Sequence, residues 1–179
     1  MITQSPAAPA PPTELVLQDE HDLSALHSLA DPSHLTTLTL RNCHTSDLHL
    51  LAELTSLTTL DLSFCRLVTD LRPLAGLTQL TSLDLSWCSQ VSDLGPLAGL
   101  LNLTILDLSL CSQVSDLGPL AGLTNLTTLD LGYCTQVSDL SPLAGLKALI
   151  TLDLTGCGRK IRAGRLRALA GLPQLTILR

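Results

Sequence analysis

Residues 80–102 read LTSLDLSWCSQVSDLGPLAGLLN, and residues 103–125 repeat this stretch with three differences. Residues 57–79 and 126–148 carry the same unit with more changes. Self-similarity at a fixed period of about 20–30 residues is typical of a solenoid, in which each unit buries its apolar side only by stacking on its neighbours. The repeat therefore predicts an elongated domain built from similar layers.

The unit has the pattern LxxLxLxxC followed by VxDLxPLAGL. This pattern resembles the leucine-rich repeat, with Cys at the position where that family more often has Asn. The second half, VSDLGPLAGLTNL at residues 114–126, is most similar to the subclass found in bacterial internalins and in a phosphatase-regulating scaffold of the nucleus. The resemblance implies an α/β fold, namely a right-handed leucine-rich-repeat solenoid with a parallel concave β-sheet and 3₁₀ or short helical turns on the convex side. It also implies protein binding, because such arrays mostly bind proteins.

The chain divides into three segments. Residues 1–12, MITQSPAAPAPP, have a Pro/Ala bias that predicts a disordered tail. Residues 13–34 resemble a degenerate half-repeat with a short helix at LSALHSLA, and we expect this segment to cap the N-terminal end of the core. The leucine-rich-repeat domain spans residues 35–179, with full repeats that begin at residues 35, 57, 80, 103, 126 and 149.

The last repeat departs from the pattern. It is longer than the others and contains the sequence RLRALA, which predicts an α-helix. A truncated final strand should follow, with Leu178 at the position that Leu152 occupies in the preceding strand.

Each unit predicts one strand and one tight turn. The LxxLxL segment alternates apolar and polar residues, which is the pattern of a strand with one buried face. In the second half an Asp precedes Pro and Ala-Gly, which suits the start and the end of a short 3₁₀ or helical turn. The residues expected to cap these turns are Asp47, Asp70, Asp93, Asp116 and Asp139.

The six cysteines share the ninth position of the repeat, which should face the core. We interpret them as a column of buried reduced thiols, because a buried Cys behaves as a small hydrophobic residue. A disulfide framework is not expected, because such frameworks are typical of small secreted chains. A zinc site is not expected either, because cysteines in a straight column do not converge on one tetrahedral centre. Free thiols and a start without a secretory signal pattern predict a cytoplasmic protein, and no apolar run approaches the ~20 residues that span a membrane. The cysteines are Cys43, Cys65, Cys88, Cys111, Cys134 and Cys157.

The fifth position of each repeat should point outward from the concave sheet. It holds Thr39 in the first repeat and a carboxylate in the following ones. Strands lie about 5 Å apart, where like charges repel by roughly 0.8 kcal/mol in bulk water, so we expect raised carboxylate pKa values. Two interpretations remain open: a solvated face simply tolerates these carboxylates, or they attract a basic partner or cations. We name this column the acidic ladder, and its members are Asp61, Asp84, Asp107, Asp130 and Asp153.

The eighth position lies at the rim of the concave face and differs in every repeat. It runs from Asn42 to Gly156 and includes all three aromatic residues of the protein. Exposed aromatic side chains are the usual energetic anchors of protein interfaces, and a contiguous apolar patch marks an interaction site. The alternative is that the rings only pack over the adjacent loop and cover the cysteine layer. We name the apolar members of this column the apolar rim: Phe64, Trp87, Leu110 and Tyr133.

Charge is distributed unevenly along the chain. Between Pro73 and Leu146 there are six Asp and no Lys or Arg, whereas six of the ten basic residues lie from Arg159 onward. Nucleic acid requires clustered cations, so we do not expect it to bind the repeat body. An acidic body favours a partner protein with a basic surface. The basic tip and an uncovered final strand favour weak self-association through the C-terminal end.

The sequence contains no recognisable catalytic arrangement. All five histidines lie between residues 21 and 49, and neither a Ser–His–Asp grouping nor a Gly-rich phosphate loop can be placed. We therefore predict a non-enzymatic protein without a cofactor or metal site. The leading hypothesis is a protein–protein interaction module that binds a partner on its acidic, apolar-rimmed concave face. The alternatives are a sensing or regulatory array of a larger cytosolic signalling protein or enzyme complex, and a self-associating scaffold.

Overall fold

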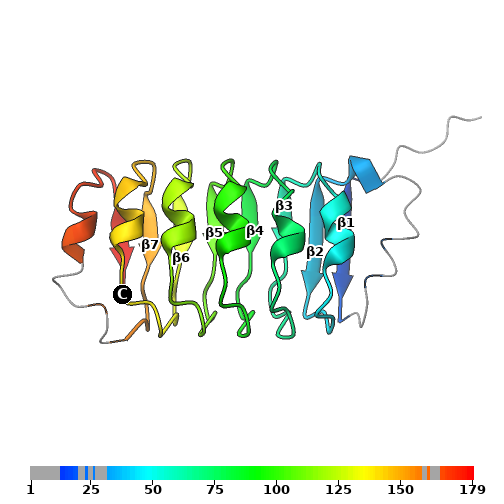
Figure 1. Ribbon diagram of the computed structural model, residues 1–179, viewed down its shortest axis with the longest axis horizontal. Coiled ribbons are helices and arrows are strands. Elements are labelled where there is room, and N and C mark those ends of the chain that lie inside the picture. Colours follow the sequence, from blue (N-terminus) through cyan, green and yellow to red (C-terminus); the bar gives the residue numbers. More distant parts are fainter. Residues whose placement is uncertain (1–12, 20–22, 24–25, 27–31, 159–160, 162–165) are drawn as a thin grey trace, which may run out of the picture.

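The computed structural model describes residues 13–19, 23, 26, 32–158, 161 and 166–179. The described strands form one parallel sheet of eight strands in sequence order, so that successive repeats lie side by side along the molecule (Figure 1). This arrangement confirms the predicted solenoid of parallel strands. The strands are β1 (Glu14–Gln18), β2 (Thr37–Arg41), β3 (Thr59–Asp61), β4 (Ser82–Asp84), β5 (Ile105–Asp107), β6 (Thr128–Asp130), β7 (Thr151–Asp153) and β8 (Thr176–Leu178).

Neighbouring strands pair at equal positions of the repeat. Leu83 of β4 lies between Leu60 of β3 and Leu106 of β5, so the apolar positions form a continuous column. β1 extends this register, with Leu15 opposite Leu38. Because side chains alternate between the two faces of a strand, a slip by one residue would turn the whole leucine column towards solvent.

The second half of each repeat forms a 3₁₀ turn, and the turns stack in a second layer along one side of the sheet (Figure 1). Each capping Asp accepts a hydrogen bond from the backbone N–H two residues further on, as at Asp93 Oδ1, which accepts from Gly95 N at 2.8 Å. The Asp therefore lies two residues before the 3₁₀ turn, and the Leu between them occupies the N-cap position. The turns are η1 (Pro32–His34), η2 (His49–Glu53), η3 (Arg72–Leu74), η4 (Gly95–Gly99), η5 (Gly118–Gly122), η6 (Ser141–Gly145) and η7 (Arg167–Leu169).

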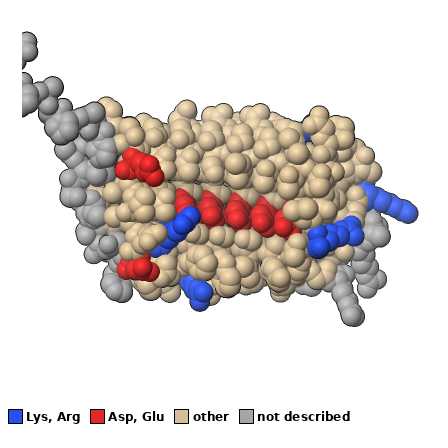
Figure 2. Space-filling view, turned by 180° about the vertical axis from the view of Figure 1, so that it is seen from behind, with Lys and Arg blue, Asp and Glu red and all other residues tan. Residues whose placement is uncertain are grey.

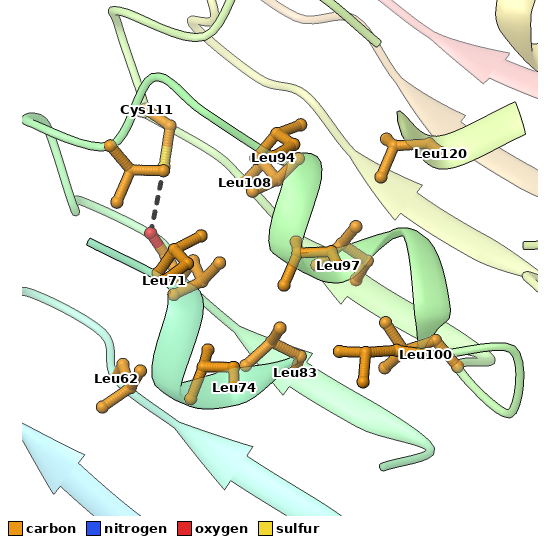
Figure 3. Packing of buried hydrophobic residues seen from close by; sticks show 14 of the residues in the cluster. Leu62, Leu71, Leu74, Leu83, Leu94, Leu97, Leu100, Leu108, Cys111 and Leu120 are labelled. Atoms are coloured by element: carbon orange, nitrogen blue, oxygen red, sulfur yellow. Dashed lines mark hydrogen bonds between the residues drawn. The ribbon is translucent and has the colours of Figure 1, made fainter. Parts of the chain in front are cut away.

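The core lies between the sheet and the layer of turns, where leucines from both sides interdigitate (Figure 3). Burying one such side chain stabilises the fold by about 1.5–3 kcal/mol. In the repeat that begins at residue 80, every core residue is at most 1% exposed: Leu80, Leu83, Leu85, Cys88, Val91, Leu94, Leu97 and Leu100.

The six cysteines are free and buried, as the sequence predicted. Cys111 Sγ donates to the backbone oxygen of Leu85, one repeat earlier, at 3.1 Å (Figure 3). Cys65, Cys88, Cys134 and Cys157 make the equivalent bond. A thiol can therefore serve in this slot, because it fills a small apolar site and still satisfies a buried carbonyl. Burial raises the pKa of the Cys65 thiol to about 12.

The C-terminal strand corrects one prediction. Ile177, not Leu178, pairs with Leu152, and Leu178 pairs with Asp153. Leu178 consequently lies in the outward-facing column and is 46% exposed, while Ile177 packs against the core. Two consecutive apolar residues give no alternation, so the sequence could not decide which of them faces inward.

The described part of the predicted C-terminal α-helix contains the 3₁₀ turn η7. The remainder of that helix, the N-terminal tail and most of the predicted LSALHSLA helix lie outside the described residues.

Candidate protein-binding face

The acidic ladder is a continuous row. Asp61 pairs with Asp84, and the same register continues through Asp107 and Asp130 to Asp153, one residue from each strand of β3–β7. Figure 2 shows this row across the face of the sheet that lies opposite the 3₁₀ turns, with basic side chains near its two ends.

Each carboxylate of the ladder uses one oxygen to bind its own backbone. Asp107 Oδ1 accepts a hydrogen bond from Ser109 N at 2.7 Å, and the other four make the same contact two residues further on. This contact closes the backbone turn that follows the strand. No described residue donates a hydrogen bond to the second oxygen, Oδ2, of Asp107, Asp130 or Asp153. The arrangement leaves one carboxylate oxygen in each of these repeats without a hydrogen-bond donor among the described residues.

The N-terminal end of the ladder is already neutralised. Arg41 Nε donates to Asp61 Oδ2 at 2.7 Å, with the Arg side chain 56% and the Asp side chain 13% exposed. The ion pair therefore leaves four carboxylates, Asp84 to Asp153, to act as a charged strip. Sequence reasoning missed this pair, although Arg41 is the one cation within the β2–β7 strand segments.

Burial is the first cause of the altered titration in the ladder. It raises the pKa of Asp84 and of Asp130, while the hydrogen bonds from Ser86 and from Gly132 N oppose this effect. Repulsion from neighbouring carboxylates adds to the increase. For Asp84 and Asp130 the sequence predicted the direction of the pKa shift, but it assigned the increase to repulsion, which is a smaller cause than burial.

The eighth position of the repeat adopts a left-handed backbone conformation that the sequence analysis did not foresee. Its N–H reaches over to the next repeat, as when Trp87 N donates to Ser109 O at 2.8 Å. The left-handed region costs an ordinary L-residue roughly 1–2 kcal/mol, while Gly and Asn tolerate it. The φ values are 55° for Asn42, 64° for Phe64, 63° for Trp87, 62° for Leu110, 59° for Tyr133 and 69° for Gly156.

Phe64 and Tyr133 of the apolar rim each contact the eighth-position residue of the next repeat. The rings of Phe64 and Trp87 stack with centroids 5.2 Å apart and planes 14° apart, and Arg66 Cζ lies 5.4 Å from the Trp87 ring centroid. Tyr133 covers Gly156, where an added Cβ would lie 2.5 Å from the ring. Phe64 and Trp87 nevertheless remain 38% exposed, and Tyr133 remains 52% exposed. The rings therefore pack on the next repeat and still present apolar surface to solvent.

A second column of polar groups serves the backbone instead of a ligand. Threonine hydroxyls at the second position donate to the preceding repeat, as from Thr104 Oγ1 to Thr81 O at 2.9 Å. Asn102 Nδ2 similarly donates to Thr78 O. These residues line a shallow open groove of about 650 Å³. Their hydrogen bonds explain the repeated Thr as part of the fold.

The described residues contain no group of three or more His, Cys, Asp or Glu side chains that could hold a metal ion. His49 and Asp47 do approach each other, with Nδ1 and Oδ1 2.9 Å apart. A search of the same residues for membrane spans found no helix with sufficient length and hydropathy.

Comparisons with known proteins agree with the geometry. A family model described as leucine-rich repeats (2 copies) matches residues 33–76, 78–122, 101–145 and 124–163. The crystal structure of internalin C2 from Listeria monocytogenes is 36% identical, with a TM-score of 0.69 over 92% of this chain and 70% of that one. Internalin F of the same organism is 25% identical, with a TM-score of 0.57 over 93% of this chain and 59% of that one. No curated protein sequence matches the chain.

Proposed function

Because this chain belongs to the leucine-rich repeat family, as an internalin-like member, we propose that it binds a partner protein on the sheet face formed by the acidic ladder and the apolar rim. The family consists largely of non-enzymatic interaction modules, which fits a chain whose repeated positions form continuous columns along the sheet. The apolar rim supplies the anchors, and the ladder selects a partner with a basic surface.

The observation that carries this proposal is that bulky side chains occupy the eighth position of the repeat, where the backbone is left-handed. Folding alone would favour Asn or Gly at the eighth position, and Asn42 and Gly156 show that both fit it. Phe64, Trp87 and Tyr133 are instead held there and left partly exposed. Local strain retained at a surface is typical of functional sites, and exposed aromatic residues are typical interface anchors.

Charge supports a basic protein as the partner. Asp84 to Asp153 form an acidic strip across four strands, which disfavours a nucleic-acid backbone and favours Lys or Arg side chains. The six buried free thiols support a reducing compartment such as the cytoplasm, where cysteines are kept unpaired.

The test compares captured proteins before and after removal of the rim anchors. Immobilised wild type and the double variant Trp87→Asn plus Tyr133→Asn are cross-linked to extract proteins, and bound species are quantified by mass spectrometry. Asn is chosen because it tolerates the left-handed conformation, so the fold should persist. We expect the specific partner to be lost from the rim variant.

A matched control separates the rim from general hydrophobic adhesion. Leu101 and Ile150 are 55% and 47% exposed and lie outside the rim. The double variant Leu101→Asn plus Ile150→Asn should capture the same partner as the wild type. Equal recovery by the wild type and the rim variant would show that the rim is not the binding surface.

A further inference from the structure

We propose that the partner binds as an amphipathic α-helix that lies along the array, across the strands, and places one Lys or Arg side chain on the ladder in each repeat. This inference rests on the proposed function and adds the shape of the occupant. It follows from the spacing of the ladder, from the width of the surface and from the ion pair that the protein makes with itself.

The spacing of the ladder matches a helix. Parallel strands lie about 4.8 Å apart, so Asp84 to Asp153 spans about 14 Å in three steps. Helix residues i, i+3, i+7 and i+10 share one stripe and lie at about 0, 4.5, 10.5 and 15 Å along the axis. An extended strand places same-face residues about 6.8 Å apart and would need about 20 Å for four cations. A polyproline helix advances about 9.3 Å per turn and reaches only alternate carboxylates.

The width of the surface also matches a helix. In four successive repeats the rim residue lies three residues beyond the ladder residue, as Trp87 follows Asp84 and Tyr133 follows Asp130. Because the backbone turns directly after the strand, the three residues from Asp84 to Trp87 span less than the ~10 Å of an extended segment. Both columns therefore fit within the ~10–12 Å diameter of a helix. A helix with a basic stripe and an adjacent apolar stripe can therefore reach both columns at once.

Arg41 shows how a cation sits on this surface. Its guanidinium donates to Asp61 Oδ2 while Asp61 Oδ1 stays bound to Ser63 N. The same Oδ2 position receives no donor from the described residues at Asp107, Asp130 and Asp153. A bound helix would continue the row that Arg41 begins, with each Arg or Lys taking the next Oδ2.

The probe is a synthetic peptide held as a helix, and it is compared with a peptide of the same amino-acid composition whose Arg spacing suits an extended strand. Arg at positions 1, 4, 8 and 11 forms one stripe, and Leu at positions 2, 5, 9 and 12 forms a stripe about 100° around the helix. A covalent staple between positions 3 and 7, on the opposite face, is needed because isolated short helices are marginal in water. The comparison peptide has the same composition without the staple and carries Arg at every second residue. Affinities are measured by fluorescence anisotropy at low and at physiological salt.

Two protein variants of equal charge change locate the binding. Asp107→Asn plus Asp130→Asn removes two ladder charges, while each Asn oxygen still accepts the backbone N–H two residues on. Asp93→Asn plus Asp116→Asn makes the same change in the turn layer, where both Asp residues accept an equivalent bond. We expect the ladder variant to bind the stapled peptide about fivefold more weakly, and the turn variant to bind it as the wild type does.

The outcomes separate the two proposals. The stapled peptide should bind about tenfold more tightly than the alternating peptide, which loses roughly half of the charge pairs. Equal or tighter binding by the alternating peptide, with loss in the ladder variant, overturns the helix and leaves the binding face intact. Failure of both peptides to bind at millimolar concentration also overturns the helix, since partner capture reports on the face independently. Equal weakening by the ladder and turn variants overturns the proposed face itself.

Discussion

The left-handed conformation of the rim implies that its side chains can be removed with little loss of stability, and Tyr133→Asn tests this directly. Tyr133 has a φ of 59° and is 52% exposed, with its ring on Gly156. The substitution keeps the backbone N–H that donates to Thr155 O. It changes only the strain at this residue and the packing of the ring.

The two effects are of similar size and opposite sign. Asn relieves part of the roughly 1–2 kcal/mol that the left-handed region costs an ordinary residue. Losing a half-buried ring forfeits about half of the 1.5–3 kcal/mol of a fully buried aromatic side chain. We therefore expect the free energy of unfolding to change by less than about 1 kcal/mol. Leu129, fully buried in the same repeat, is the comparison: Leu129→Ala should cost about 2–5 kcal/mol.

The assay is urea unfolding followed by circular dichroism. Tryptophan fluorescence would not serve every variant, because Trp87 is the single tryptophan and is removed in the rim variant. An unchanged slope of the unfolding free energy against urea concentration would show that the variants bury the same surface as the wild type. A loss of 2 kcal/mol or more for Tyr133→Asn would mean that the ring is required for folding. The rim would then be explained by packing, and the reasoning behind the binding face would fail.

Three further predictions concern other parts of the molecule. Burial raises the pKa of Asp84 and Asp130, so the stability of the protein should fall as pH rises from about 3.9, the unfolded-state pKa, through the folded-state pKa values of these residues. The melting temperature of the double variant Asp84→Asn plus Asp130→Asn should fall less over the same pH range. Gly156→Ala should destabilise the protein, since its Cβ meets the Tyr133 ring at a φ of 69°, and Tyr133→Asn should relieve part of the loss in a double-mutant cycle. All six thiols should resist Ellman's reagent in native buffer and react after denaturation.

Each of these predictions has an outcome that contradicts it. An identical pH dependence in the wild type and the double Asn variant would show that burial does not raise the pKa of Asp84 and Asp130. Additive effects of Gly156→Ala and Tyr133→Asn would mean that the ring does not contact residue 156. Rapid labelling of any thiol in native buffer would place it outside the core.

The repeat architecture could be predicted because identical residues fill identical slots. Leu60, Leu83 and Leu106 have the same neighbours in successive layers, so one unit determines the register of all. The prediction fails where this redundancy ends. At β8 the pair Ile177–Leu178 gives no alternation, and the longer segment that precedes it has no counterpart in the other repeats.

The candidate site could be predicted as columns, but not in its conformation. The left-handed backbone at the eighth position has a signal in the sequence, since Asn42 and Gly156 at the ends of the column are the residue types that tolerate it. The Arg41–Asp61 ion pair has no repeated counterpart, so no pattern could indicate it. The backbone bonds of the ladder are indicated only by the small residues two positions after each Asp.

The two columns of the site share a property that the fold does not explain. At the fifth position an Asn would accept the same backbone N–H as Asp107 does, without repulsion between strands. At the eighth position Asn or Gly would fit the backbone with less strain than Trp87 does. Both columns therefore hold residues that folding alone would not favour, at positions three residues apart in each repeat. Two departures at nearby positions of the repeat are expected when the residues there serve binding.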